Sequence, residues 1–310
     1  MSTLSNDVQP IPAGPQETAV PAQPETRPFY WSVRREVWEN RSIYLAPLIV
    51  AAVVLFGSFV GASSTLPKRM KNLPADPVQR HAVIVQPFSM APAPIMLATF
   101  IVGLFYALDA LYGERRDRSI LFWKSLPVSD RTTVLSKASI PLIVLPLIAF
   151  VLGLTVQLIL LVLTTPVLAA KGVNPARVWA EFRYPQEALV MVYGLTVHSL
   201  WFAPIYAWLL LVSAWARRSP ALWAILPPVM LLAFEQMIPG ANPFGQLLKY
   251  RVMGAMGLAF QIDAMHVPID RLWHLSPGRF LSSGGLWSGL LFAAVCLAVA
   301  VRLRRNREPS

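Results

Sequence analysis

Few side chains in this 310-residue sequence have the chemistry and spacing of a catalytic or metal site. His266 and His274 lie near Asp263 and Asp270, and imidazole together with carboxylate oxygens could bind a divalent cation. Histidines in a polar loop are more often solvated, so we expect no metal site. The chain also lacks a G-x-x-x-x-G-K-[ST] phosphate loop and an H-E-x-x-H zinc motif. The sequence therefore predicts neither an enzyme nor a cofactor-binding protein.

Ionisable, aromatic and proline residues inside long apolar runs form a second group of candidates. An ionisable group within a membrane segment is a functional candidate by default, because its burial in lipid is costly. A histidine bonded inside a helix bundle, or a glutamate that reaches the membrane surface, explains the same residues without a function. We consider five residues as candidates for a transport pathway: His198, Trp201, Pro227, Pro228 and Glu235.

The elements that must position these residues are apolar helices. The chain is 55% hydrophobic and only 14% charged, whereas a soluble domain has about 25% charged residues. Apolar runs of about 18 residues or more are typical of helices that cross a bilayer. We expect an all-α, polytopic membrane protein with six transmembrane helices, at about residues 43–62, 92–111, 140–163, 188–212, 221–238 and 286–301.

Three flanking segments complete the predicted organisation. Residues 1–28 are rich in Pro, Gln, Thr and Ala, and we expect a disordered cytoplasmic tail there. Residues 29–310 then form the transmembrane domain. Its first part, residues 29–42, has Tyr30, Val33 and Val37 at helical spacing, which predicts a helix at the membrane interface or an ordinary anchor. Residues 242–260 also have helical spacing, and a re-entrant segment in the outer leaflet would suit them.

The positive charge of the chain indicates its orientation and not a nucleic-acid partner. The formal net charge is +11, but many Lys and Arg residues gather near the ends of predicted spans, where they determine topology. They are more numerous in the segments on the side of the N-terminus. Six spans then place both termini in the cytoplasm, although the basic first outer loop, with Lys68 and Arg69, opposes this orientation.

A charged segment from Gly113 to Lys137, GERRDRSILFWKSLPVSDRTTVLSK, separates the second and third predicted spans. Pro127 disfavours helical backbone at Leu126, and Ser129 or Asp130 can cap the next helix. This predicts a short surface helix with an apolar group surrounded by arginines. Such a group is typical of a contact surface with another protein, or of an anchor in the headgroup layer. Its members are Ile120, Leu121, Phe122 and Trp123.

The same segment resembles the region between the second and third spans of ABC type-2 permeases, the membrane subunits of ATP-binding-cassette transporters. In that family a Glu precedes a small residue, aliphatic residues, Leu-Pro-Val-Ser, and an aliphatic residue shortly before a Lys. A polar tail, a surface helix before the first span and a long loop before the last span extend the resemblance. The long, basic first outer loop and the short sixth span depart from the pattern. The matching residues are Glu114, Ser119, Ile120, Leu121, Leu126, Pro127, Val128, Ser129, Leu135 and Lys137.

The resemblance implies a transport subunit of the bacterial inner membrane that performs no ATP hydrolysis itself. A separate ATPase subunit, carrying ATP and Mg, would bind the surface segment, and a second permease subunit would complete a path for export through the lipid bilayer. The residues implied in coupling are Glu114, Arg115, Arg116, Ile120, Leu121, Phe122, Trp123, Leu126 and Pro127. Two alternatives stay open. One is a membrane protein that transmits ATPase motion without moving a substrate, and the other is a proton-coupled transporter using His198, Asp109 or Glu235.

Overall fold

The computed structural model describes residues 27–117, 128–238, 242–261 and 272–306. Within these ranges the chain is helical, apart from turns and one isolated bridge between Phe260 and Leu275. Five of the described helices are long and apolar enough to cross a membrane. The predicted all-α class and the presence of several membrane-spanning helices are therefore confirmed at this level.

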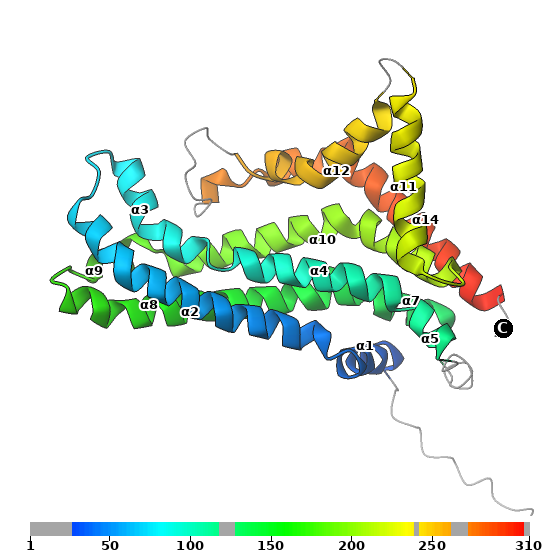
Figure 1. Ribbon diagram of the computed structural model, residues 1–310, viewed down its shortest axis with the longest axis horizontal. Coiled ribbons are helices and arrows are strands. Elements are labelled where there is room, and N and C mark those ends of the chain that lie inside the picture. The colour runs from blue at the N-terminus through cyan, green and yellow to red at the C-terminus, as the bar shows by residue number, and fades with distance from the viewer. Residues whose placement is uncertain (1–26, 118–127, 239–241, 262–271, 307–310) are drawn as a thin grey trace, which may run out of the picture.

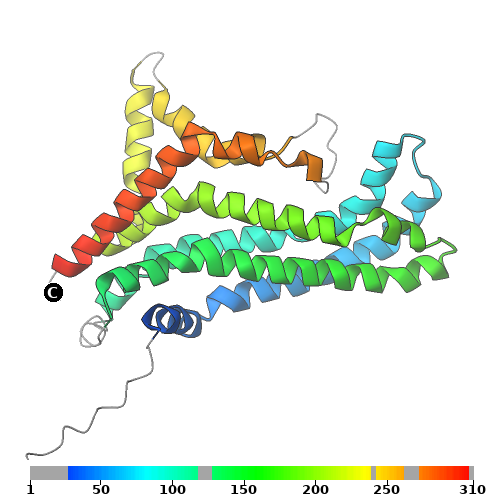
Figure 2. The same cartoon turned by 180° about the vertical axis from the view of Figure 1, so that it is seen from behind.

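Four long helices lie side by side and form the body of the molecule: α2 (Ser42–Lys71), α4 (Ala93–Asp109), α8 (Leu145–Ala170) and α10 (Tyr184–Trp215) (Figure 1). The view from behind shows the same arrangement (Figure 2). The continuous helix that contains α8 begins earlier than the apolar run suggests, at Asp130, because α7 (Asp130–Ser139) leads into α8 through a π-helical turn, η1 (Ile140–Val144). Pro141 and Pro146 lack a backbone N–H, and such missing donors favour an irregular turn within a long helix.

Shorter helices cover the two ends of this bundle, which we name after them. The α1 end carries α1 (Pro28–Glu39) and α5 (Tyr112–Arg116), whereas the α3 end carries α3 (Pro77–Ser89) and α9 (Ala176–Glu181) (Figure 1). The predicted helix before the first span is thus present as α1. The first predicted outer loop contains α3, which the sequence interpretation missed.

The helices extend beyond the apolar runs that predicted them. α2 continues to Lys71, through Pro67, Lys68 and Arg69, although the predicted span ended at Ala62. Helical hydrogen bonds are local, so a helix can continue where its side chains leave the apolar layer. Apolar runs consequently predict the membrane-embedded length better than the helix ends.

The fifth predicted span forms α11 (Pro220–Gln236), which differs from the five long helices. It has 17 residues, its backbone remains helical through Pro227 and Pro228, and only Ala224 among its side chains is buried. Both views show α11 steeply inclined to the four-helix body (Figures 1 and 2). Apolar composition predicts an apolar environment, but not the direction in which a helix runs, so a sixth crossing stays a prediction.

The remaining helices pack against one side of α10. They are α12 (Pro243–Ala259), η2 (Leu272–His274), α13 (Pro277–Leu281) and α14 (Gly284–Asn306). The helical spacing of residues 242–260 is thus confirmed by α12, whereas its re-entrant character stays a prediction. α14 runs back to the α1 end, where it approaches α5 and α7 (Figure 1).

α10 occupies the centre of the fold and is the most buried of the five long helices. Its Tyr206 packs closely against α4 at Gly103. A Cβ atom at position 103 would lie 3.1 Å from Cε1 of Tyr206, so glycine permits the close approach of these two helices. This contact fixes the spacing of α4 and α10 near the sites described below.

Candidate functional site

Six charged side chains meet at the α1 end of the bundle, and we call them the charge network. They come from four separate helices, α1, α5, α7 and α14, and carry three positive and three negative formal charges. The members are Arg35, Glu36, Glu114, Asp130, Lys137 and Arg304.

Lys137 lies at the centre of the charge network. Its Nζ is 2.8 Å from Oε1 of Glu36 and 3.1 Å from Oε1 of Glu114. The side chains of Lys137 and Glu36 are 3% and 1% exposed, and that of Glu114 is 9% exposed. Buried ionised groups are costly unless they are paired and hydrogen-bonded, and this arrangement satisfies both conditions.

Three further side chains complete the hydrogen bonding of the two glutamates. Arg304 of α14 contacts Oε2 of Glu114 through Nη1, and its Nε lies 3.0 Å from Oδ1 of Asp130. Tyr106 of α4 donates its hydroxyl proton to Oε2 of Glu36 at 2.7 Å. Arg35 lies 2.8 Å from Glu36 and 3.3 Å from Glu114. The network therefore joins α1, α4, α5, α7 and α14.

Arg115 and Arg116 have different environments, although they are adjacent in the predicted coupling segment. Arg115 donates to the carbonyl oxygens of Ser213 and Ala216 at the C-terminal end of α10, where helical carbonyls lack partners. The Ser213 hydroxyl accepts from two N–H groups at the start of α5, those of residues 111 and 112. Arg116 is exposed and pairs with Asp117 at 2.9 Å.

These contacts hold both flanks of the predicted coupling segment. Glu114 precedes residues 118–127, and Asp130 and Lys137 follow them. The Ser129 hydroxyl accepts from the N–H of Thr132, so Ser129, one of the two predicted candidates, caps α7. Six predicted coupling residues lie outside the described part of the chain: Ile120, Leu121, Phe122, Trp123, Leu126 and Pro127.

The sequence interpretation missed the part of the network that comes from α1 and α14. Glu36 lies on the same face of α1 as Val33 and Val37, which pack against the core. In the sequence, the indication that Glu36 would be buried was its position beside the apolar residues Val33 and Val37. Burial raises the pKa of the neighbouring Glu39 carboxyl above its ordinary value, while the charge of Arg35 acts in the opposite direction. Arg304 was interpreted only as part of a basic, topology-determining end.

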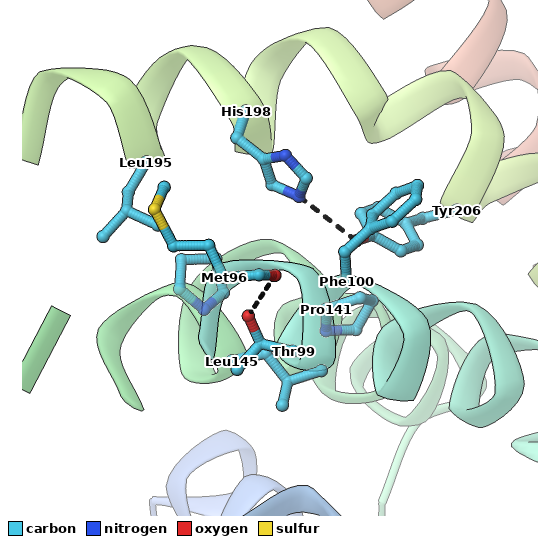
Figure 3. A pocket seen from close by; sticks show the side chains of 9 residues that line it. Met96, Thr99, Phe100, Pro141, Leu145, Leu195, His198 and Tyr206 are labelled. Carbon is cyan, nitrogen blue, oxygen red and sulfur yellow. Dashed lines mark hydrogen bonds between the residues drawn. The ribbon is translucent and has the colours of Figure 1, made fainter. Parts of the chain in front are cut away.

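His198 lines a small cavity in the middle of the bundle, between α4, η1, α8 and α10 (Figure 3). The cavity volume is about 20 Å³, which is enough for one water molecule. Nε2 of His198 lies 3.4 Å from the hydroxyl of Tyr206, and the ring packs against Phe100 and Phe202. These contacts fit the prediction that His198 is a histidine bonded inside the helix bundle.

The other pathway candidates lie elsewhere in the fold. Trp201 faces α12, where its Nε1 donates to the carbonyl oxygen of Arg251 at 2.6 Å. Glu235 accepts from the N–H groups of Phe244 and Gly245, so it caps the start of α12. Pro227 and Pro228 lie on α11. The five candidates therefore do not form one site.

The described residues contain no group of three or more His, Cys, Asp or Glu side chains placed to hold a metal ion. The long apolar helices and the buried charges at one end are consistent with a multi-pass membrane protein whose polar groups meet at a membrane surface. Comparisons of the chain with family models, with curated proteins and with solved structures gave no match.

Proposed function

We propose that this chain is the permease subunit of an ATP-binding-cassette exporter in a bacterial inner membrane. A separate ATPase subunit binds residues 118–127, and a second permease subunit completes the path. The observation that carries the proposal is the buried ion pair between Glu114 and Lys137, 3.1 Å apart. Glu114 and Lys137 are charged residues near the two ends of the segment that resembles the permease family. Their ion pair gives a structural reason for a glutamate and a lysine at this separation.

The charge network supports a mechanical role for this segment. Displacement of residues 118–127 by a bound ATPase would act on Glu114 and on Asp130. Both are tied to Arg304, and Glu114 is also tied to Lys137. Removing one partner of a buried ion pair costs about 3–5 kcal/mol. Glu114 and Asp130 should therefore move together with the helices that the charge network joins, and not independently of them. Motion of the segment would thereby reach α4, α8 and α14.

The path of the chain supports six crossings with both termini in the cytoplasm. α10 ends at the α1 end, where Ser213 contacts α5, and α14 ends there too, where Arg304 contacts Glu114. If α14 crosses the membrane toward that end, the chain between α10 and α14 must first return to the opposite side. α11 together with α12 supplies this return, with α12 as a re-entrant helix.

The proton-coupled alternative receives less support. His198 lies in a cavity large enough for one water, Glu235 caps α12, and Asp109 is exposed beside Arg116. Proton transfer needs a chain of polar groups or waters between carriers, and these three groups lie in separate places. Transport that needs a proton gradient but no ATPase would nevertheless favour this alternative.

Pull-down of the ATPase tests the proposal. Co-purification from native membranes first identifies the ATPase, and the double variant Leu121→Ala, Phe122→Ala is then compared with wild type. Burial of one such side chain contributes roughly 1.5–3 kcal/mol, so binding should weaken by about two to three orders of magnitude. The matched control is Leu97→Ala, Phe105→Ala, which truncates exposed side chains on α4.

Equal recovery of the ATPase by the double variant and the control, at matched membrane levels, would overturn the assignment of the segment. Stimulation of ATP hydrolysis by a transported compound separates a transporter from a protein that only transmits motion. A complex whose ATPase activity responds to no exported compound, and that moves none, would favour the second possibility.

A further inference from the structure

A polar pocket lies at the α3 end of the bundle, far from the charge network. Its volume is about 170 Å³, and its wall combines residues of α3, α9, η2 and the start of α10. Most other side chains of the bundle are apolar, so a concentration of charge here needs a reason. The polar and aromatic lining residues are His81, Glu181, Arg183, Gln186, Glu187 and Trp273.

Two hydrogen bonds fix the carboxylates of this pocket. Nδ1 of His81 lies 2.7 Å from Oε2 of Glu181, and the Ser89 hydroxyl donates to Oε1 of Glu187. His81 and Glu187 are 6% and 5% exposed, so the wall is built into the fold. A carboxylate accepts about four hydrogen bonds, so a carboxylate that already has protein partners can also receive a ligand.

A positive group stands beside the two carboxylates. Arg183 precedes α10, its side chain is exposed, and it forms no ion pair with any residue that the structure describes. A guanidinium presents a planar set of donors that suits a phosphate or a carboxylate. The pocket thus offers acceptors on one part of its wall and donors on another.

The depth of the pocket in a membrane follows from the length of α10. This helix has 32 residues, and a hydrocarbon layer of about 30 Å spans about 20 residues at 1.5 Å each. Centring that layer on α10 leaves Glu187 about one helical turn beyond its edge, in the headgroup layer. Trp273, which is exposed at the same pocket, suits that depth.

We propose that this pocket binds a small zwitterion. The ammonium group of the ligand donates hydrogen bonds to Glu181 and Glu187, with the indole of Trp273 beside it, and the phosphate or carboxylate of the ligand accepts from Arg183. The ligand is the ethanolamine headgroup of a phospholipid or a soluble molecule with the same two groups, such as an amino acid. The proposal does not depend on ATPase coupling, because the pocket lies at the other end of the bundle.

Calorimetry with soluble probes tests the proposal on the full chain in phosphatidylglycerol nanodiscs. Phosphoethanolamine and glycine carry both charges, whereas ethyl phosphate and ethanolamine carry one each. At least one zwitterion should bind about tenfold or more tightly than either single-charge probe, since each hydrogen bond to a charged group contributes appreciably. In parallel, mass spectrometry of protein from mixed nanodiscs measures whether phosphatidylethanolamine is retained.

Variants connect the binding to the pocket. Arg183→Gln should weaken zwitterion binding by about tenfold or more, whereas Arg177→Gln, an exposed arginine on α9 outside the pocket, should leave it unchanged. Glu187→Gln tests the ammonium side in the same way. Because Glu187 is buried and this variant can fail to fold, Arg183→Gln carries the decision.

The remaining outcomes distinguish the source of the ligand. Retention of phosphatidylethanolamine by wild type, and its loss in Arg183→Gln, identifies a lipid headgroup. Binding of a soluble zwitterion that persists in phosphatidylethanolamine nanodiscs identifies a soluble ligand. The proposal is overturned if neither zwitterions nor phosphatidylethanolamine bind, or if Arg183→Gln binds as well as wild type.

Discussion

Lys137 is the residue on which the charge network depends most. It is the cation shared by Glu36 and Glu114, with Nζ within 3.1 Å of both carboxylates. Removal of this cation would leave two like charges close together in a buried place. The pair with Glu36 also fixes α1, which precedes the first long helix, against the beginning of the third.

Replacement of Lys137 by Met should therefore lower the free energy of unfolding by about 3–5 kcal/mol, the usual cost of breaking a buried ion pair. Thermal unfolding of the purified protein in detergent measures this change. Lys171→Met is the matched control, because Lys171 is exposed at the end of α8. If the two variants unfold at the same temperature, the network does not stabilise the α1 end.

A second change tests whether the loss comes from uncompensated charge. Lys137→Met leaves three carboxylates with only two arginines in the charge network, and adding Glu114→Gln removes this excess negative charge, so the double variant should regain part of the lost stability. Unfolding of the double variant by the same method checks this. A purely additive loss would show that packing of the lysine chain, and not its charge, stabilises this end.

Sequence reasoning found some of these residues and missed others for identifiable reasons. Glu114 was found because it lies in a local motif, and the Ser129 cap because capping acts within one turn. Glu36 and Arg304 were missed because their partners lie far away in the chain. Pairing across such separations depends on tertiary packing, which no local pattern encodes.

At the scale of elements, Arg251 is one of the residues that hold α12 against the bundle. Its guanidinium donates to the carbonyl oxygens of Trp201 and Gly285, the latter at 2.7 Å, and it lies 4.6 Å from the Trp201 ring. One side chain thus joins α10, α12 and α14. The helical spacing of α12 was predictable from sequence, but this attachment was not.

Replacement of Arg251 by Met should loosen α12 while the long helices stay intact. Amide exchange within residues 243–259 should become about tenfold faster or more, because hydrogen bonds to a charged group are lost and local opening becomes easier. Hydrogen–deuterium exchange by mass spectrometry measures this. The control is Lys249→Met, an exposed position of the same helix. Unchanged exchange in α12 would mean that its apolar contacts suffice.

For the whole molecule, the sequence predicted the class of fold better than the course of the chain. Apolar runs located five long helices because membrane-spanning segments have a minimum length. They could not show that residues 220–236 form a shorter helix inclined to the others (Figure 1). That helix contacts α4, α10 and α12, and such tertiary packing has no local sequence pattern.

Cysteine labelling should decide between five and six crossings. Single cysteines replace Asn174, Ser219 or Asn242 in a Cys296→Ser background, and a membrane-impermeant maleimide is added to intact cells. With six crossings and cytoplasmic termini, positions 174 and 242 should be labelled, and position 219 only after permeabilisation. Equal labelling of positions 219 and 242 would remove the sixth crossing.

The equal number of positive and negative charges in the charge network has an electrical consequence. Moving one elementary charge across a potential of 100 mV involves about 2.3 kcal/mol, but three cations and three anions that move together carry no net charge. Rigid motion of this cluster therefore exchanges no net work with the membrane voltage. A fluorophore on a cysteine at Asp117, beside the cluster, should give the same signal when voltage is stepped in liposomes. These six side chains can thus move together in an energised membrane without acting as a voltage sensor.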